Sequence, residues 1–359
     1  MNRVLLTTGG TGGHIFPALA VAEELRRRQS DIALLFVGSH YGPEKRLAGK
    51  AGVPFRGLHV RGILGRGARA VGAALHMAVA VSQAVGIIRE FRPDVVAGFG
   101  GYAAFAPMFA GWLLGVPCVL HEQNAIAGTS NRFLARLSRR VCVSLPQTEG
   151  FKASKCVLVG NPVRAAVREL ERKTACVDSQ HLLVVGGSQG AHSLNAFMVE
   201  HLANFRAAGV HLWHQTGERE EAAIREAYTR AGYESTCATA FIDNMAEAYA
   251  WADVVLCRAG ASTVAELCAA GLPSVLVPFP HAIHDHQTRN AAALERCGAA
   301  ILVPEQDMEK RELENVLLRL LHDHRERERM GRAALACARP DAASSVVAVL
   351  EETVNMGRK

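Results

Sequence analysis

The sequence predicts an α/β protein made of two doubly wound, Rossmann-like domains, each with a parallel sheet between helices. Its 359 residues are more than a single hydrophobic core usually holds. An apolar stretch followed by glycines occurs twice: residues 4–8 lead into the glycine loop 9–14, and residues 182–185 lead into the glycine loop 186–192. Each pattern is typical of a buried strand whose loop opens a helix, so one unit is repeated about half a chain later.

Further apolar stretches of strand length alternate with helical stretches. They cover residues 32–37, 95–99, 118–121 and 141–144 in the first half, and 210–214, 254–258 and 274–278 in the second. This alternation predicts parallel strands joined by helical crossovers, and we expect the two domains to face each other across a cleft. The turn-forming residues 160–162 divide an N-terminal domain, 1–160, from a C-terminal domain, 161–340. An apolar stripe after Pro340 predicts a last helix over 341–357, which we expect to join the N-terminal domain.

The charge is distributed unevenly along the chain. Within the net charge of +6, residues 1–160 carry 19 Lys and Arg against 8 Asp and Glu, and residues 161–359 carry 21 against 26. A basic half suits an anionic lipid surface or a phosphorylated acceptor, and a solvated basic surface is the alternative. No long basic run occurs, and we expect no nucleic-acid partner. The nine cysteines form no Cys-x-x-Cys pair, which indicates a reducing compartment rather than a disulfide framework or a zinc site.

Residues 95–120 contain no charged side chain and are long enough to span a membrane. The segment holds five glycines and two prolines, however. We interpret it as a strand, a glycine turn, a buried helix and a second strand, because parallel strands buried on both faces read as continuous apolar runs. The N-terminus shows no signal-peptide pattern.

Both glycine loops are candidates for phosphate binding. Backbone N–H groups in such a loop approach a phosphate closely, and the following helix adds a favourable dipole. A tight turn alone is the alternative, but two matched loops favour phosphate. Ile15 stands where the last glycine of a dinucleotide fingerprint would be, and no P-loop motif occurs. The sequence therefore disfavours a dehydrogenase and a P-loop enzyme.

Three further polar groups follow predicted strands. Residues 121–124, His-Glu-Gln-Asn, lie at the edge where open α/β sheets bind ligands. Thr263 and Glu266 have the spacing of a capping box, so Glu266 is interpreted as a helix cap or as an acceptor for ribose hydroxyls, with the cap favoured by spacing alone. The three histidines around Asp285 fit no standard zinc spacing, and we expect no metal.

These loops, taken together, resemble one family over nearly the whole chain. The motifs are GGTGGHIFPALAVAEEL at 9–25, HEQNAIAG at 121–128, GNPVR at 160–164, VVGGSQGA at 184–191, FIDNM at 241–245, ADVVLCRAGASTVAEL at 252–267 and DHQTRNA at 285–291. They are similar to the MurG family, the UDP-N-acetylglucosamine:undecaprenyl-diphospho-muramoyl-pentapeptide N-acetylglucosaminyltransferases of peptidoglycan synthesis. The resemblance implies a GT-B fold and an inverting transferase that moves N-acetylglucosamine onto the C4 hydroxyl of lipid I to give lipid II, with no obligatory cofactor or metal.

The resemblance also implies a donor site, mostly in the C-terminal domain. Ile242 would meet the uracil through its backbone, Glu266 would hold the ribose hydroxyls, and Gln287 and Asn290 would meet the sugar. The remaining donor contacts, to the diphosphate and the nucleotide pocket, would come from Arg164, Ser188, Gln189, Gly190, Ala261, Ser262, Thr263 and Val264. Residues of the N-terminal domain that would close on donor or acceptor are Thr11, Gly12, Gly13 and Asn124, and those that would meet the acceptor diphosphate are Gly100, Gly101 and Tyr102.

The family works as a peripheral protein on the cytoplasmic face of the cell inner membrane. The resemblance therefore implies an anionic membrane surface and other cell-wall synthesis proteins as partners, besides UDP-N-acetylglucosamine and the lipid-linked muramyl-pentapeptide.

The sequence departs from the family's pattern in two places. Residues 103–107 differ from the family in the glycine loop that starts at Gly100. Residues 70–88 are dominated by Ala and Val where the family often has larger side chains. The candidates for a membrane patch are Leu75, Met77, Trp112, Arg66 and Arg69.

The reaction requires a base for the acceptor hydroxyl and stabilisation of the leaving diphosphate. We predict His14 as the base, since the ordinary pKa of histidine is near 6.5, and Glu122 as the competing candidate. The helix N-terminus after residues 186–190 and Arg164 would stabilise the diphosphate. The alternatives are a diacylglycerol glycosyltransferase, a UDP-N-acetylglucosamine epimerase and a scaffold protein without catalysis.

Overall fold

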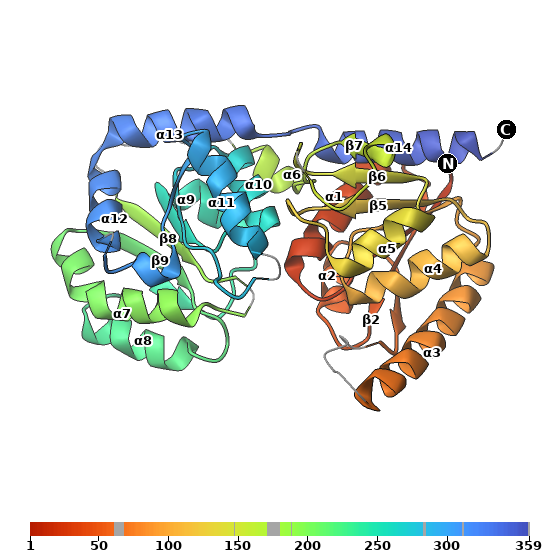
Figure 1. The fold of residues 1–359 in the computed structure, drawn as a ribbon. Coiled ribbons are helices and arrows are strands. Elements are labelled where there is room, and N and C mark those ends of the chain that lie inside the picture. The colour runs from red at the N-terminus through yellow and green to blue at the C-terminus, as the bar shows by residue number, and fades with distance from the viewer. Residues whose placement is uncertain are drawn as a thin grey trace. The chain divides into compact units, whose positions relative to one another are not determined.

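The computed structural model describes residues 1–60, 68–146, 148–170, 180–187, 189–282, 285–310 and 312–357, and for residues 68–75 it describes the backbone. The chain divides into two compact units (Figure 1). Unit 1 comprises Met1–Arg164 with Arg339–Lys359, and unit 2 comprises Ala165–Ala338. The divisions predicted from the sequence are at residues 160 and 340.

Unit 1 contains a seven-stranded parallel sheet in the order β3-β2-β1-β4-β5-β6-β7. The strands are β1 (Arg3–Thr7), β2 (Ala33–Ser39), β3 (Phe55–Leu58), β4 (Val95–Gly98), β5 (Cys118–Glu122), β6 (Arg140–Val143) and β7 (Cys156–Leu158). Val4 and Leu6 of β1 belong to one buried cluster and Leu5 to another, and all three are 0% exposed. Both faces of the sheet are therefore covered, which is why β1 is apolar at every core position.

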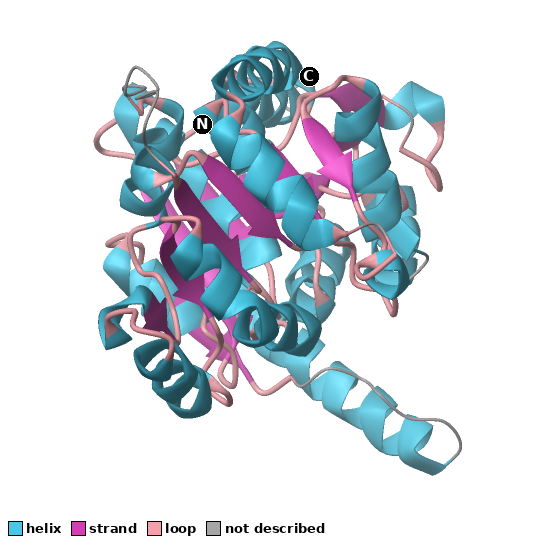
Figure 2. Cartoon of the chain, turned by 90° about the vertical axis from the view of Figure 1, so that its left-hand side faces the viewer, coloured by secondary structure: helices cyan, strands magenta, loops and turns pink. Residues whose placement is uncertain are grey.

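Helices cover both faces of this sheet. Strands flanked by helices are also seen when the chain is viewed from the side of unit 2 (Figure 2). The cluster that contains Val4 includes residues from α1 (Gly12–Arg28), α2 (Glu44–Lys50) and α14 (Ala342–Met356). The cluster that contains Leu5 includes residues from α3 (Ala68–Phe91), α4 (Phe105–Leu113) and α5 (Thr129–Leu137). A short 3-10 turn, η1 (Tyr102–Ala104), leads into α4.

Unit 2 repeats the arrangement with a six-stranded parallel sheet in the order β10-β9-β8-β11-β12-β13. The strands are β8 (His181–Val185), β9 (His211–Gln215), β10 (Ala238–Thr239), β11 (Val254–Cys257), β12 (Ser274–Leu276) and β13 (Ala300–Leu302). The helices are α6 (Ala165–Arg168), α7 (His192–Ala207), α8 (Glu221–Arg230), α9 (Met245–Trp251), α10 (Ala261–Ala270), α11 (His286–Arg296), α12 (Leu313–His322) and α13 (His324–Cys337). Helices α7, α8 and α12 pack on alternate strand residues in one core cluster, and α10 packs among α9, α11 and α13.

The strand order reverses once in each sheet, between β1 and β4 in unit 1 and between β8 and β11 in unit 2. At such a point the loops after the two strands run to opposite faces of the sheet, and open α/β sheets bind ligands in the crevice between them. The loops after β1 and β8 are the two glycine loops singled out from the sequence. The fold thus places both loops where a ligand site is expected.

The structure confirms two doubly wound α/β units. Residues 95–120 form β4, η1, α4 and β5, as predicted, and α14 begins two residues after Pro340. The stretch His324–Met356 is long and apolar enough in composition to cross a membrane. It consists of two helices, α13 and α14, and Val346, Val347 and Leu350 of α14 are at most 1% exposed in the core of unit 1.

Candidate active site

In unit 1 the glycine loop after β1 packs directly on the glycines that follow β4, Gly100 and Gly101. Gly9 N donates to Gly100 O at 3.3 Å, and the hydroxyl of Thr8 donates to the same oxygen at 3.2 Å. A Cβ at Gly101 would overlap the backbone of Gly9, and Gly101 has a φ of +80°. Only glycine satisfies both the space and the backbone here, so the loop after β4 is fixed by the loop after β1.

A chain of hydrogen bonds through buried side chains reaches His14. Gln123 Nε2 donates to Phe99 O at 2.9 Å, which orients its amide because a carbonyl can only accept. The same Nε2 lies 3.1 Å from His121 Nδ1, and His121 Nε2 donates to Gly160 O at 3.0 Å. Gln123 Oε1 therefore accepts from His14 Nδ1 at 3.0 Å. Neutral His14 then carries its proton on Nδ1 and its lone pair on Nε2, the form that a general base requires.

His121 is a neutral link in this chain. Its side chain is 1% exposed, and burial lowers its pKa to about 4, against the opposing effect of the hydrogen bond to Gly160. The neutral ring can accept from Gln123 while it donates to the carbonyl of Gly160. The row of hydrogen bonds from Gly160 to His14 therefore keeps one arrangement of protons at neutral pH.

Glu122 is the centre of a second network. Its Oε1 accepts from the backbone and side-chain nitrogens of Asn124 at 3.0 and 3.2 Å, and its Oε2 accepts from Asn131 Nδ2 at 2.7 Å and from Gly128 N at 3.4 Å. The residue is 1% exposed. Both oxygens are occupied as acceptors, so Glu122 shapes the loop that carries Asn124. Asn131 was not predicted, because its contact with Glu122 depends on the packing of α5 against β5.

The remaining predicted residues of unit 1 surround the first glycine loop. Thr11 is the N-cap of α1 and makes no side-chain capping bond, while Gly12 and Gly13 form the first turn with His14. The ring of Tyr102 lies over Gly10, since a Cβ there would be 3.6 Å from it. Arg164 belongs to unit 1, with its guanidinium 4.2 Å from the centre of the Phe16 ring, a cation–π contact.

Gln215 ties together two predicted parts of the donor site in unit 2. Its Nε2 donates to Gly187 O in the second glycine loop at 2.9 Å, and its Oε1 accepts from Ile242 N at 2.9 Å. Gly190 has a φ of +75° and packs against the backbone of Gly217. Gln189 is exposed, and Ser188 lies outside the described residues. Gln215 was not predicted as a site residue, although it ends strand β9 at the edge where such sheets bind ligands.

The helix α10 corrects the capping interpretation of Glu266. Its N-cap is Gly260, without a side-chain capping bond, because the helix starts at Ala261 and Thr263 lies inside the first turn. Glu266 is 7% exposed, and its Oε2 accepts from the hydroxyl of Tyr249 at 3.0 Å. The first turn consists of Ala261, Ser262, Thr263 and Val264.

Helix α11 carries the predicted sugar contacts. Gln287 Oε1 accepts from Phe279 N at 2.9 Å. Asn290 is 2% exposed, and its Nδ2 donates to Ala259 O at 3.2 Å, just before α10. Asn290 thus holds the loop that opens α10. Within the described residues, which leave out His284, no group of three or more His, Cys, Asp or Glu could hold a metal ion.

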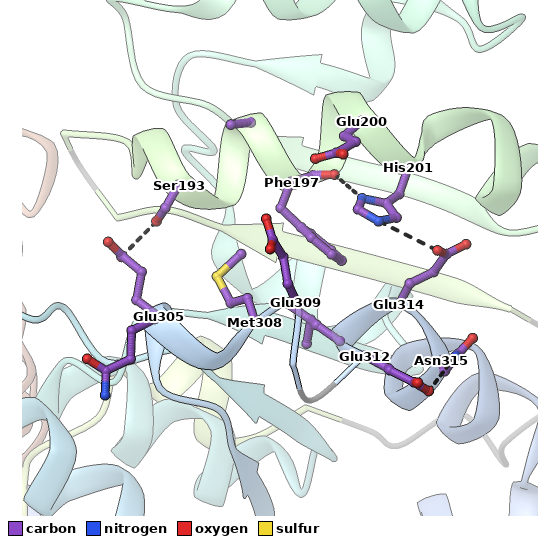
Figure 3. Close-up of a pocket in the computed structure, with 13 residues that line it drawn as sticks. Ser193, Phe197, Glu200, His201, Glu305, Met308, Glu309, Glu312, Glu314 and Asn315 are labelled. Carbon is purple, nitrogen blue, oxygen red and sulfur yellow. Dashed lines mark hydrogen bonds and ion pairs between the residues drawn. The ribbon is translucent and has the colours of Figure 1, made fainter.

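A hollow of about 660 Å³ lies elsewhere in unit 2, between α7 and α12 (Figure 3). Its lining includes five glutamates, namely Glu200, Glu305, Glu309, Glu312 and Glu314. None of the predicted site residues lines it. Its negative charge disfavours a diphosphate, so this hollow is not a candidate for the donor site.

An aromatic patch lies on α4 and α5 of unit 1. It consists of Phe105, Phe109, Trp112 and Phe133, with neighbouring ring centres 5.6 to 5.9 Å apart. Trp112 is 46% and Phe133 41% exposed, and Arg132 and Arg136 on α5 are exposed beside them. Met77 is half-buried on α3. Arg66 and the side chains of Arg69 and Leu75 lie outside the described residues. The phenylalanines were not predicted as part of a membrane patch, although Phe105 and Phe109 have helical spacing.

Two doubly wound units with a glycine loop at each switch point have the architecture of the GT-B class of glycosyltransferases. Residues 4–143 match the glycosyltransferase family 28 N-terminal domain, and residues 181–346 match the C-terminal domain of the same family. The chain belongs to glycosyltransferase family 28 and, within it, to the MurG family.

Relatives match over the full length of the chain. A UDP-N-acetylglucosamine–N-acetylmuramyl-(pentapeptide) pyrophosphoryl-undecaprenol N-acetylglucosamine transferase of Nitratidesulfovibrio vulgaris is 51% identical over 356 residues, covering 98% of each chain. The protein of the same name from Lawsonia intracellularis is 44% identical over 349 residues, covering 96% of this chain and 95% of that one. The crystal structure of Acinetobacter baumannii MurG has a TM-score of 0.75 at 32% identity and covers 98% of this chain and 100% of that one. A UDP-N-acetylglucosamine 2-epimerase, with a TM-score of 0.70 at 14% identity and coverage of 100% and 98%, shares the fold alone.

Proposed function

We propose that this chain transfers N-acetylglucosamine from UDP-N-acetylglucosamine to the C4 hydroxyl of the lipid-linked muramyl-pentapeptide, with inversion at the anomeric carbon. Relatives that are named as N-acetylglucosamine transferases of this kind match the chain over its full length and support the assignment. The observation that carries the mechanism is the oriented His14 in the glycine loop at the switch point of unit 1.

His14 acts as the general base in this proposal. Its Nε2 takes the proton from the acceptor hydroxyl while the oxygen forms a bond to the anomeric carbon of the donor sugar. The bond between that carbon and the UDP oxygen breaks, and its electron pair leaves with UDP. A positioned base contributes about 10²–10⁴-fold. Glu122 is the weaker candidate because its two oxygens already accept hydrogen bonds from Asn124, Gly128 and Asn131.

Unit 2 holds the donor in this proposal. The N-terminus of α7, which follows the second glycine loop, suits the diphosphate, and the buried Glu266 suits the ribose hydroxyls. The Ile242 backbone would contact the uracil. Gln215 bonds both Ile242 N and Gly187 O, and so it would fix the distance between the uracil contact and the second glycine loop. Arg164 would add positive charge to the leaving diphosphate.

The membrane contact is assigned to unit 1. The aromatic patch exposes large rings beside Arg132 and Arg136, a combination that favours binding at an anionic interface. The protein would act as a peripheral enzyme on the cytoplasmic face of the inner membrane, where its lipid-linked acceptor lies. Other cell-wall synthesis proteins remain proposed partners.

Transfer of labelled N-acetylglucosamine from its UDP donor to a short-chain analogue of the muramyl-pentapeptide lipid tests the function, with and without a chelator. Transfer that survives chelation supports both the acceptor and a reaction without metal. UDP binding without any transfer would favour another acceptor lipid or a scaffold protein. Glu266→Ala should weaken UDP binding, and unchanged UDP affinity would contradict its assigned role.

A further inference from the structure

A carboxylate that the sequence analysis did not single out lies behind the first glycine loop. Glu44 is the first residue of α2, and it is 0% exposed. Its Oε1 accepts a hydrogen bond from Gly10 N at 3.0 Å. Its Oε2 is also buried and has no hydrogen-bond partner among the described residues. A buried carboxylate with so few partners costs folding free energy, so its presence points to another role.

The surrounding backbone leaves space for this carboxyl group. A Cβ at Gly38 would lie 3.0 Å from Glu44 Cγ, and a Cβ at Gly42 would overlap Oε2. Gly42 is not among the glycines with positive φ, so a side chain at this position would meet the Glu44 carboxyl group and not a restriction of the backbone. The site is therefore shaped around Glu44.

Glu44 contacts the loop at a position whose backbone conformation favours glycine. Gly10 has a φ of +102° and lies between Glu44 and the ring of Tyr102. Gly9, its neighbour, is the residue on which Gly100 and Gly101 pack. Two residues after Gly10 the helix α1 begins, with His14 in its first turn. A shift of Gly10 would thus move the imidazole.

We propose that Glu44 is a positioning residue of the transfer reaction, which holds the first glycine loop through the Gly10 amide and so sets the place of His14. This inference rests on the proposed role of His14 as base. Glu44 acts as a hydrogen-bond acceptor and takes no part in proton transfer. Because Gly10 N is engaged by Glu44, this amide is not offered to a phosphate.

Substitution of Glu44 separates this role from general stability. Glu44→Met keeps a similar length but removes the acceptor, and a misplacement of about 1 Å at a reacting group lowers kcat by up to about 100-fold. We expect Glu44→Met to lower kcat by about 10- to 100-fold with UDP affinity unchanged. Glu44→Gln keeps an oxygen for Gly10 N and should stay within about threefold of the wild type. Glu24→Met is the control, because Glu24 is a buried carboxylate of α1 paired with Arg27 and Arg28. This variant should be less stable but keep its kcat.

A second pair of variants covers the case in which Glu44→Met does not fold. Gly42→Ala leaves Glu44 in place but displaces its carboxyl group, so it should lower kcat in the wild type and have no effect in Glu44→Ala. The proposal would be overturned by a wild-type kcat in Glu44→Met, or by a loss of kcat in Glu44→Gln as large as that in Glu44→Met. It would also be overturned if Gly42→Ala lowered kcat by the same factor in the wild type and in Glu44→Ala. If the wild-type protein itself shows no sugar transfer, that result would instead contradict the proposed function.

Discussion

Replacement of Gln123 by methionine tests whether its amide sets the proton arrangement of His14. Methionine has a similar volume but can neither accept from His14 Nδ1 nor donate to Phe99 O and His121 Nδ1. The imidazole of His14 would remain in place but lose the acceptor that keeps its proton on Nδ1. Part of the population would then carry the proton on Nε2, where the lone pair is needed.

The size of the effect follows from the bonds removed. One neutral hydrogen bond contributes about 0.5–1.5 kcal/mol, so loss of the bond to His14 should lower kcat by up to about tenfold. Phe99 O and His121 Nδ1 lose a buried partner, and each unsatisfied group costs about 1–3 kcal/mol of folding stability. We expect a kcat about tenfold lower, an unchanged KM for the UDP donor, and a free energy of unfolding lower by about 2–6 kcal/mol.

The assay is the initial rate of sugar transfer in Gln123→Met, in His14→Ala and in the double variant. If Gln123 acts through His14, Gln123→Met has no further effect on kcat once His14 is alanine. Ser138→Ala is a matched control in unit 1, because it removes another buried hydrogen bond, from Ser138 Oγ to Leu134 O at 2.9 Å. It should lower stability and leave kcat unchanged. Equal factors from Gln123→Met with and without His14 would refute the reasoning.

Three further outcomes are expected. Burial lowers the pKa of His121 to about 4 and of His214 to about 3, so the unfolded chain binds more protons below pH 6.5 and stability falls as the pH falls. Urea denaturation should show a loss of about 2 kcal/mol per histidine between pH 7.5 and 5, and an unchanged stability would contradict it. Glu122→Gln should lower the melting temperature, because its NH₂ group would face the donors that now bind the carboxylate, such as Asn131 Nδ2; a wild-type melting temperature would show that the network is dispensable. Trp112→Ala should weaken sedimentation with anionic vesicles without changing transfer to a water-soluble acceptor, and unchanged sedimentation would place the membrane contact elsewhere.

The strands predicted from the sequence are those buried on both faces. Unbroken apolar runs occur at residues 4–6, 95–99 and 254–257 because the neighbouring strands and both helix layers exclude water there, and the structure has β1, β4 and β11 in these places. The strands that the sequence did not predict include the edge strands β3, β7 and β10. The edge strand β7 ends at Leu158, which is 42% exposed, so its composition lacks the continuous apolar pattern.

The candidate site divides in a similar way. Motifs placed His14, Glu122 and Glu266 at the carboxyl ends of strands, because a strand end and its following loop are contiguous in sequence. Glu44 and Gln215 were missed since their contacts join segments that are distant along the chain, Gly10 in one case and Gly187 with Ile242 in the other. Spacing carries no information on such partners, and the packing of parallel strands brings them together.

The two glycine loops look alike in sequence, yet different groups hold them. The first loop has the buried carboxylate Glu44 on the amide of Gly10, and the second has the neutral amide Gln215 on the carbonyl of Gly187. Glu44 already occupies a backbone N–H group of the first loop, whereas Gln215 contacts a backbone carbonyl of the second loop. This difference supports diphosphate binding at the second loop and acid–base chemistry at the first, where His14 lies. The repeated strand, loop and helix of this chain would thus serve two different steps of one transfer, distinguished by the side chain behind each loop.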